Sequence, residues 1–184
     1  MDANPYEAPA APIDYAPAPV IVTDRPAYFP VSIVKLVVLG VLTFGLYELA
    51  WFYQNWKLIK QRDNSDIQPF WRAVFGVFFC HRLFRDIGQT AATQTANSSF
   101  PASSLATVWI LLTVAARLPD PFWLLSLVSI APLVVVQRTV NQINTQVAPG
   151  HDPNSRWTAS TYLTVIFGGG FTLLVLIGLM IPGK

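Results

Sequence analysis

The sequence predicts an all-α fold, that of a polytopic helical membrane protein with about four transmembrane helices, amphipathic interfacial helices and a disordered N-terminal tail. Two features of its composition predict this. Hydrophobic residues make up 53% of the 184 residues and charged residues 12%, whereas soluble domains carry roughly 25% charged residues. The third observation is how apolar and polar residues are distributed along the chain: long apolar runs alternate with short polar stretches. Contact with lipid explains this sorting better than one oversized core.

Residues 1–27 form the predicted tail, and residues 28–184 the helical domain. The tail alternates Ala and Pro around two tyrosines and four acidic residues, without apolar periodicity. Proline removes backbone donors and favours extended polyproline II, so we expect a disordered segment. It serves either as a solubilising tether or as a docking peptide for a partner. No cleaved secretory signal is expected, since a basic region before an apolar one is missing.

The first predicted span covers residues 31–53. This run is close to the ~20 residues that a helix needs to cross a hydrocarbon core of ~30 Å. Next, Phe52, Trp56 and Ile59 repeat at helical spacing opposite polar residues, which predicts a helix emerging along a membrane face. The expected membrane-interface anchors are Tyr47, Trp51, Tyr53, Trp56, Lys57 and Lys60.

Residues 70–88 are ambiguous. Their uncharged stretch, residues 73–80, is too short to cross a bilayer, and the charged residues that follow fall on one side of a helix. An interfacial amphipathic helix is the favoured interpretation. A full span with buried arginines stays open.

Three further spans are predicted over residues 101–118, 121–137 and 157–181. The Pro-Asp-Pro turn at residues 119–121 joins the first two in a tight hairpin. Pro132 should kink the second of them, which continues as a polar amphipathic segment.

Basic residues outside the spans decide the topology. With residues 70–88 at the interface, eight lysines and arginines lie on one face and three on the other. If residues 70–88 span, the division is six against five. Because positive charge gathers on the cytoplasmic side, we predict four spans, with the loop after the first span inside and the acidic tail outside. The eight are Lys57, Lys60, Arg62, Arg72, Arg82, Arg85, Arg138 and Arg156, and the three are Arg25, Arg117 and Lys184.

The stretches Gly45-Leu46-Tyr47, Trp51-Phe52-Tyr53 and Asn55-Trp56-Lys57 form a motif. In it the chain resembles a family of uncharacterised bacterial integral membrane proteins built on this Gly-Leu-Tyr, Trp-Phe-Tyr, Asn-Trp-Lys core. The resemblance covers about residues 28–181 and implies a multi-pass protein of the bacterial inner membrane, without an activity. The opening NPYEAP also resembles a short N-terminal motif of small bacterial membrane proteins.

Glu48 is the sharpest candidate for chemistry, since an ionisable group within a span is rare. Counted from Val31 at 1.5 Å per residue, it lies about 26 Å along the helix, at the depth of an aromatic belt. The favoured interpretation is an interfacial residue that pairs with Arg72 or Arg82. A proton-coupled or ligand-binding carboxylate stays open.

No metal or cofactor site is expected. Cys80 and His81 point ~100° apart on a helix, and together with His151 they fall short of the ligand cluster that zinc needs. Glycine-rich phosphate loops, a serine-hydrolase elbow and zincin spacing are also missing. A formal net charge of +2 provides no basic field for nucleic acid.

Two further surfaces are candidates for contacts. Small residues recur every four positions in the last span, at Ser160, Thr164, Gly168 and Thr172, and let another helix approach closely, either within the chain or in a homo-oligomer. The polar residues after the hairpin are interpreted as a solvated helix face, with a partner-binding surface as the alternative. They are Gln137, Asn141, Gln142, Asn144 and Gln146.

The sequence therefore favours a small non-enzymatic membrane protein, an adaptor, assembly factor or envelope component. Its partners would be the lipid bilayer and other proteins. The alternative is a subunit of a transporter or channel that uses Glu48 and nearby basic residues.

Overall fold

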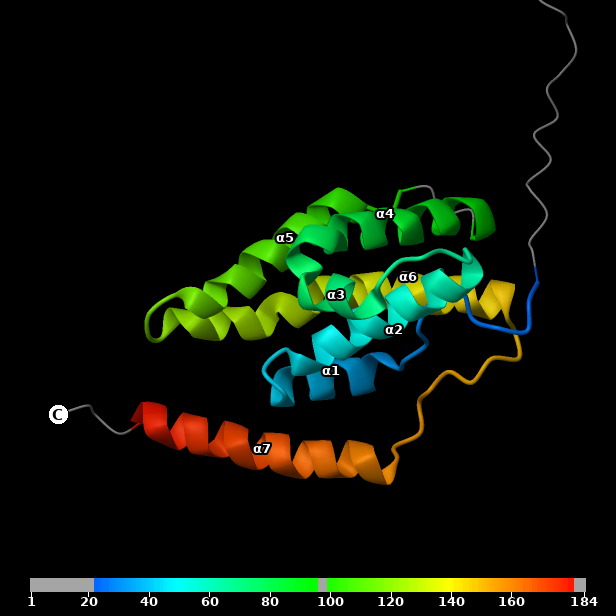
Figure 1. The fold of residues 1–184 in the computed structure, drawn as a ribbon. Helices are drawn as coiled ribbons and strands as arrows, with labels where there is room; N and C mark the ends of the chain where they lie inside the picture. Colours follow the sequence, from blue (N-terminus) through cyan, green and yellow to red (C-terminus); the bar gives the residue numbers. More distant parts are fainter. Residues whose placement is uncertain (1–21, 96–98, 181–184) are drawn as a thin grey trace, which may run out of the picture.

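Every regular element of the structure, a computed structural model that describes residues 22–95 and 99–180, is a helix. This confirms the predicted all-α class. In chain order the elements are α1 (Ile33–Leu42), α2 (Leu46–Arg62), α3 (Pro69–Val74), α4 (Gly76–Gln94), α5 (Ala102–Val114), the 3-10 helices η1 (Ala115–Arg117) and η2 (Phe122–Ser129), α6 (Ile130–Val147) and α7 (Ala159–Met180). Figure 1 shows α7 along the outer side of α1, away from the bundle formed by α2 to α6.

The predicted single helix over residues 31–53 is wrong, because the chain turns back in its middle. Helix α1 ends at Leu42, and Phe44 and Gly45 follow with positive φ angles of 50° and 84°. A right-handed helix cannot continue through two such residues, and glycine adopts this conformation at little cost. The run is therefore two short helices instead of one long one.

Helices α1 and α2 form a hairpin. Phe29, just before α1, donates its backbone N–H to Asn55 Oδ1 in the third turn of α2 at 3.0 Å. The start of α1 and the later part of α2 thus lie at the same end of the molecule (Figure 1). A hydropathy count cannot detect a reversal inside an apolar run, and Gly45 was its only local signal.

Residues 70–88 also divide, into α3 and the first part of α4. The two helices meet at Phe75, whose ψ of 35° interrupts the helical ladder. Gly76 beside it packs near the ring of Trp109, from which a Cβ would lie 3.4 Å, an ordinary van der Waals distance. Helix α4 has the predicted amphipathic character, with Leu83, Phe84 and Ile87 buried and Arg82 and Arg85 exposed.

Helices cover the residues predicted for the remaining spans. In the described part of the chain one helix, Phe122–Val147, is long and apolar enough to cross a membrane; Ile33–Leu42, Ala102–Arg117 and Ala159–Val175 are shorter apolar helices. Pro132 lies in the first turn of α6, where a missing N–H is tolerated. The change from 3-10 to α geometry comes just before it.

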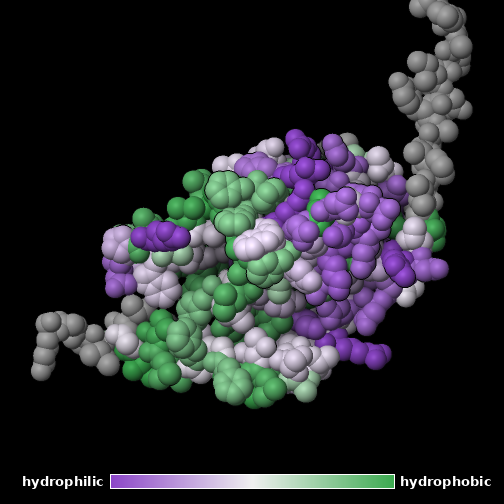
Figure 2. Space-filling view, viewed as in Figure 1, coloured by the Kyte–Doolittle hydropathy of each residue, from purple (hydrophilic) through white to green (hydrophobic). Residues whose placement is uncertain are grey.

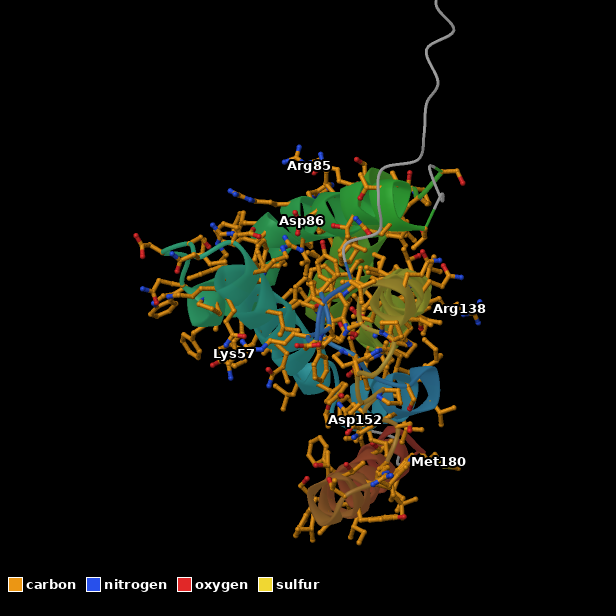
Figure 3. The ribbon with its side chains drawn as sticks, turned by 90° about the vertical axis from the view of Figure 1, so that its right-hand side faces the viewer. Lys57, Arg85, Asp86, Arg138, Asp152 and Met180 are labelled. Carbon is orange, nitrogen blue, oxygen red and sulfur yellow. The ribbon has the colours of Figure 1, made fainter. Side chains whose placement is uncertain are left out.

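The two ends of the molecule differ in polarity. Figure 2 shows hydrophilic side chains over the end where α2, α4 and α6 finish, and hydrophobic ones over most of the opposite half and along much of α7, apart from a small hydrophilic patch at the opposite tip. We call these the polar end and the apolar end. Figure 3 looks onto the polar end, around which Lys57, Arg85 and Arg138 are arranged. Arg117, the last residue of η1, and Asp120, in the turn before η2, are exposed charged residues at the apolar end.

The backbone of residues 28–31 is bound by amide side chains. Asn144 donates to the carbonyl of Tyr28 at 2.8 Å and accepts from its N–H at 3.2 Å. Asn141 donates to the carbonyl of Val31 at 3.1 Å. Tyr28 and Val31 are fully buried, so their backbone groups depend on these partners.

The same pattern continues at Phe29. Its carbonyl accepts from Gln137 Nε2 at 3.1 Å, while its N–H is bound by Asn55. Gln137 in turn accepts from the indole N–H of Trp51 at 2.6 Å, which ties α6 to α2. We call the four amide residues the amide cradle: Asn55, Gln137, Asn141 and Asn144.

The cradle corrects the interpretation of the polar residues on α6. Gln142 and Gln146 are exposed, as a solvated face requires, but Gln137 and Asn144 are fully buried. Their partner is the chain's own extended segment before α1. An apolar pattern cannot reveal an unpaired stretch of backbone, so the sequence did not indicate it.

Tyr28 also fixes this segment to the polar end through its side chain. Its hydroxyl donates to Asp86 Oδ2 at 2.9 Å and lies 2.8 Å from Thr90 Oγ1, and Arg62 binds the same Asp86 oxygen at 3.0 Å. Burial, reinforced by the charge of Asp86, raises the pKa of Tyr28 well above its usual value. The phenol therefore stays protonated and donates. Residues 1–21 of the predicted tail lie outside the described residues.

Replacing Asn144 with Ala should lower the free energy of unfolding by about 2–4 kcal/mol. The change leaves the buried N–H and C=O of Tyr28 without partners, and each such group costs ~1–3 kcal/mol. Unfolding of the purified protein by SDS in mixed micelles, followed by tryptophan fluorescence, measures this. Gln142→Ala, on the exposed face of the same helix, is the control and should change stability by less than about 0.5 kcal/mol. Equal losses in both variants would contradict the cradle.

Candidate functional site

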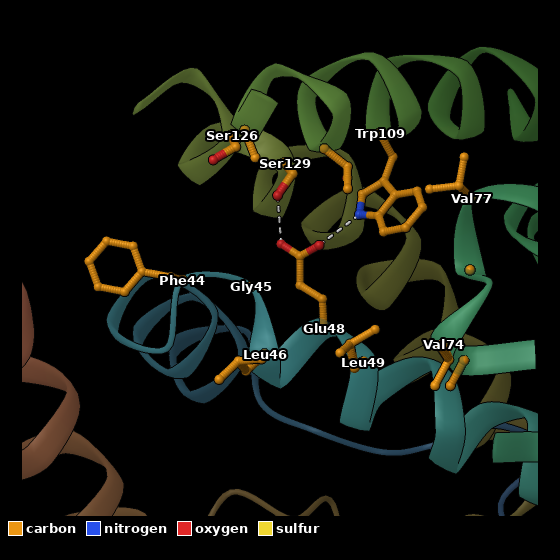
Figure 4. A pocket seen from close by; sticks show the side chains of 14 residues that line it. Phe44, Gly45, Leu46, Glu48, Leu49, Val74, Val77, Trp109, Ser126 and Ser129 are labelled. Atoms are coloured by element: carbon orange, nitrogen blue, oxygen red, sulfur yellow. Dashed lines mark hydrogen bonds between the residues drawn. The ribbon is translucent and has the colours of Figure 1, made fainter. Parts of the chain in front are cut away.

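Glu48 lies in a buried site made by three helices. It is in the first turn of α2 and is 5% exposed. The indole N–H of Trp109, in α5, donates to its Oε2 at 2.8 Å, and the hydroxyl of Ser129, at the end of η2, donates to its Oε1 at 2.7 Å. Figure 4 shows the carboxylate held between these two donors.

The local chain path positions this carboxylate. Since α2 begins directly after the turn at Phe44 and Gly45, its first turn lies at the apolar end, where Leu46 is exposed but Glu48 points into the molecule. Helix η2 returns along α5, which brings Ser129 and Trp109 to the same side of Glu48.

A pocket of about 240 Å³ opens beside Glu48. Its wall is mostly apolar, with Leu46, Leu49 and Val74 among the side chains that face it. Ser126 and Thr113 add hydroxyl groups, and the hydroxyl of Thr113 is buried without a hydrogen-bond partner in the described residues. The pocket therefore joins one carboxylate and spare hydroxyls to an apolar surface.

The prediction that Glu48 pairs with Arg72 or Arg82 is wrong. In the part of the chain that the structure describes, the ion pairs are those of Arg62 with Asp63 and with Asp86. Glu48 has neutral donors, so its charge is not balanced by a protein cation there. Such a site can hold a proton or a small cation.

The two arginines instead gather near Trp56. The guanidinium carbon of Arg72 lies 4.5 Å from the centre of the Trp56 ring, and Arg82 lines the same small pocket at the polar end. Sequence reasoning singled out both residues, but it assigned them to the wrong site. Arg72 is on α3 and Arg82 on α4, and the break at Phe75 separates the two helices.

The predicted interface anchors fall into two groups. Tyr53 and Lys57 are exposed and Tyr47 and Lys60 half-buried, as anchors can be. Trp51 and Trp56 are buried at 0% and 1% exposure. The amphipathic stripe on α2 is buried within the chain, where Phe52 packs against Phe84 of α4 and Trp109 of α5, and Trp56 lies beside Arg72 of α3.

The small-residue face of α7 meets α1 at one position. A Cβ on Gly168 would lie 2.5 Å from the carbonyl oxygen of Leu42, so only glycine allows this approach. Thr164 and Thr172 are half-buried on the same side, and their hydroxyls bond within their own helix. Ser160 is exposed. The structure thus provides a contact within the chain at Gly168.

Sequence reasoning missed Trp109 and Ser129, which lie 61 and 81 positions from Glu48. Both occur in apolar runs where a tryptophan or a serine is ordinary, so no local signal was present. A group of three or more metal-binding side chains is not found in residues 22–95 and 99–180.

Comparison of the chain with protein-family models, with curated proteins and with solved structures finds no match. Its function is therefore argued from geometry.

Proposed function

We propose that the chain is a multi-pass protein of a bacterial inner membrane, with α5, η2–α6 and α7 crossing the bilayer and the α1–α2 hairpin entering it from one side. The main support is α7. At 1.5 Å per residue its 22 residues reach about 33 Å, and large apolar side chains such as Ile166, Phe167 and Leu174 are more than half exposed. In water such a surface would cost ~25 cal/mol per Å², whereas lipid covers it without cost.

The distribution of charge supports an orientation. Arg25 lies beside the last turns of α2, at the same end of the molecule as Lys57, Arg85 and Arg138, because the α1–α2 hairpin returns the chain to that end. At the apolar end, by contrast, Arg117 is the exposed basic residue among the described residues. Positive charge marks the cytoplasmic side, so the N-terminal tail is cytoplasmic in this proposal and not outside.

The function proposed for this protein is that of a non-enzymatic adaptor or assembly component. The observation that supports this function most is that the residues following the tail are fixed to the helical domain. Thr23 N–H donates to the carbonyl of Val147 at 2.7 Å, and Tyr28 is fully buried in the cradle. A Pro/Ala-rich segment attached firmly beside a basic surface is suited to present a docking peptide near the membrane.

The pocket beside Glu48 favours a second candidate, a transporter or channel component. A carboxylate with only neutral donors, located at membrane depth beside spare hydroxyls, is the arrangement expected of a site for a proton or a monovalent cation.

Cysteine labelling tests the orientation. In a Cys80→Ala background, Asp24→Cys should react with a membrane-impermeant maleimide only after the bacterial cells are permeabilised, because the tail root is cytoplasmic. Asp120→Cys, in the turn at the apolar end, should react in intact cells and serves as the matched control. Labelling of Asp24→Cys in intact cells would restore the arrangement with the tail outside.

Co-purification tests the adaptor function. The full chain, extracted in mild detergent, should retain a protein partner that a chain lacking residues 1–21 loses, because the docking peptide is removed while the cradle stays intact. Mass spectrometry of both preparations measures the difference. Recovery of the same proteins with and without the tail would sink the adaptor proposal.

Proteoliposomes test the second candidate. Glu48→Gln keeps an acceptor for Trp109 and a donor toward Ser129, so its thermal stability should match the wild type, while proton or sodium flux should fall by at least about tenfold. Flux is followed with a pH- or sodium-sensitive dye inside the vesicles. Asp120→Asn is the control and should leave flux unchanged. A wild-type protein that adds no flux over empty vesicles rejects this candidate.

A further inference from the structure

A second, smaller pocket lies at the polar end, between the later part of α2 and the α3–α4 pair. Its volume is about 90 Å³, the space of about three water molecules or one phosphate-sized anion. The polar and charged residues that line it are Trp56, Asp63, Ser65, Arg72, Arg82 and Asp86.

Two hydrogen-bond donors of this pocket have no acceptor. Trp56 is 1% exposed, and its indole N–H is unpaired in the described residues. The hydroxyl of Ser65 is also buried and unpaired there. Buried donors normally have partners, so two unpaired donors at one pocket point to an acceptor that lies outside the described residues.

The charged side chains that line the pocket are two arginines, Arg72 and Arg82, and two aspartates, Asp63 and Asp86. Its two carboxylates are both bound by Arg62, which donates to Asp63 at 2.7 Å and to Asp86 at 3.0 Å. Arg72 and Arg82 have no carboxylate partner in the described residues. Arg62 does not line the pocket, but with it the cluster holds three guanidinium groups and two carboxylates, which leaves one positive charge over.

Arg72 is held in place by rings and not by an anion. Its guanidinium carbon lies 4.5 Å from the ring centre of Trp56 and 5.3 Å from that of Phe79. Burial and the nearby charge of Arg82 lower the pKa of Arg72. The charge of Arg82 thus disfavours the charged form of Arg72 until an anion joins the two side chains.

Apolar side chains continue from the pocket along α3 and the start of α4. Phe70, Trp71, Phe75 and Phe78 are all about half exposed or more. In the proposed membrane orientation these rings lie next to the acyl region, with the arginines at headgroup level.

We propose that Arg72, Arg82, Trp56 and Ser65 form a binding site for a phosphate-bearing anion, the headgroup of an anionic phospholipid or free phosphate. Planar guanidinium groups match phosphate oxygens, and the indole N–H and the hydroxyl supply two further donors. The site is separate from the Glu48 pocket. Its binding of phosphate does not require that the chain act as an adaptor.

Native mass spectrometry of the full, delipidated chain in a neutral detergent tests the site. Dioleoylphosphatidylglycerol should bind the wild type, and Arg72→Gln and Arg82→Gln should each weaken its affinity about tenfold, because each removes a charge-assisted contact. Trp56→Phe, which keeps a ring but removes the N–H, should weaken it about threefold to fivefold. Arg85→Gln, an exposed arginine of α4 outside the pocket, is the matched control and should stay within twofold of the wild type.

Equal weakening by Arg82→Gln and Arg85→Gln would overturn the proposal, since only surface charge would then be acting. Arg82 is exposed, so its variant keeps the test valid if Arg72→Gln fails to fold. A competition arm identifies the source of the anion. Displacement of the lipid by millimolar inorganic phosphate assigns the site to free phosphate, and retention of the lipid assigns it to the headgroup.

Discussion

The fold depends on the hydrogen bonds between the amide cradle and the backbone of residues 28–31. An extended segment without a strand beside it carries unpaired N–H and C=O groups, which would prevent its burial. Amide side chains supply both a donor and an acceptor, so Asn144 alone can bind both backbone groups of Tyr28. Once this segment is fixed between α2 and α6, α1 must start at the polar end and turn back in the apolar end.

That reversal determines what the buried polar residues can reach. Because α2 starts in the apolar end, Glu48 lies between α5 and η2, where its partners are Trp109 and Ser129. The later turns of the same helix carry Trp56 to the polar end, beside Arg72. One helix thus supports an anionic site at one end and a cationic site at the other.

Helical periodicity and apolar runs predicted the all-α class and the extents of the later helices, because those signals are local. They also marked Glu48 as unusual. The turn at Gly45 escaped prediction because a left-handed residue inside an apolar run leaves hydropathy unchanged. The cradle and the Glu48 partners escaped because amide-to-backbone and carboxylate-to-indole contacts join residues far apart in the chain.

An ion pair between Glu48 and an arginine would have neutralised both charges, but it would also have left neither side chain with capacity for a ligand. Keeping them apart has a cost, since a charge held only by neutral donors is poorly compensated at low dielectric. The helical packing does not relieve that cost, because Arg72 is stacked on Trp56 and Glu48 is enclosed by α5 and η2. Among the described residues neither charge has a partner of opposite sign, and this is the physical reason for proposing an ion at both sites.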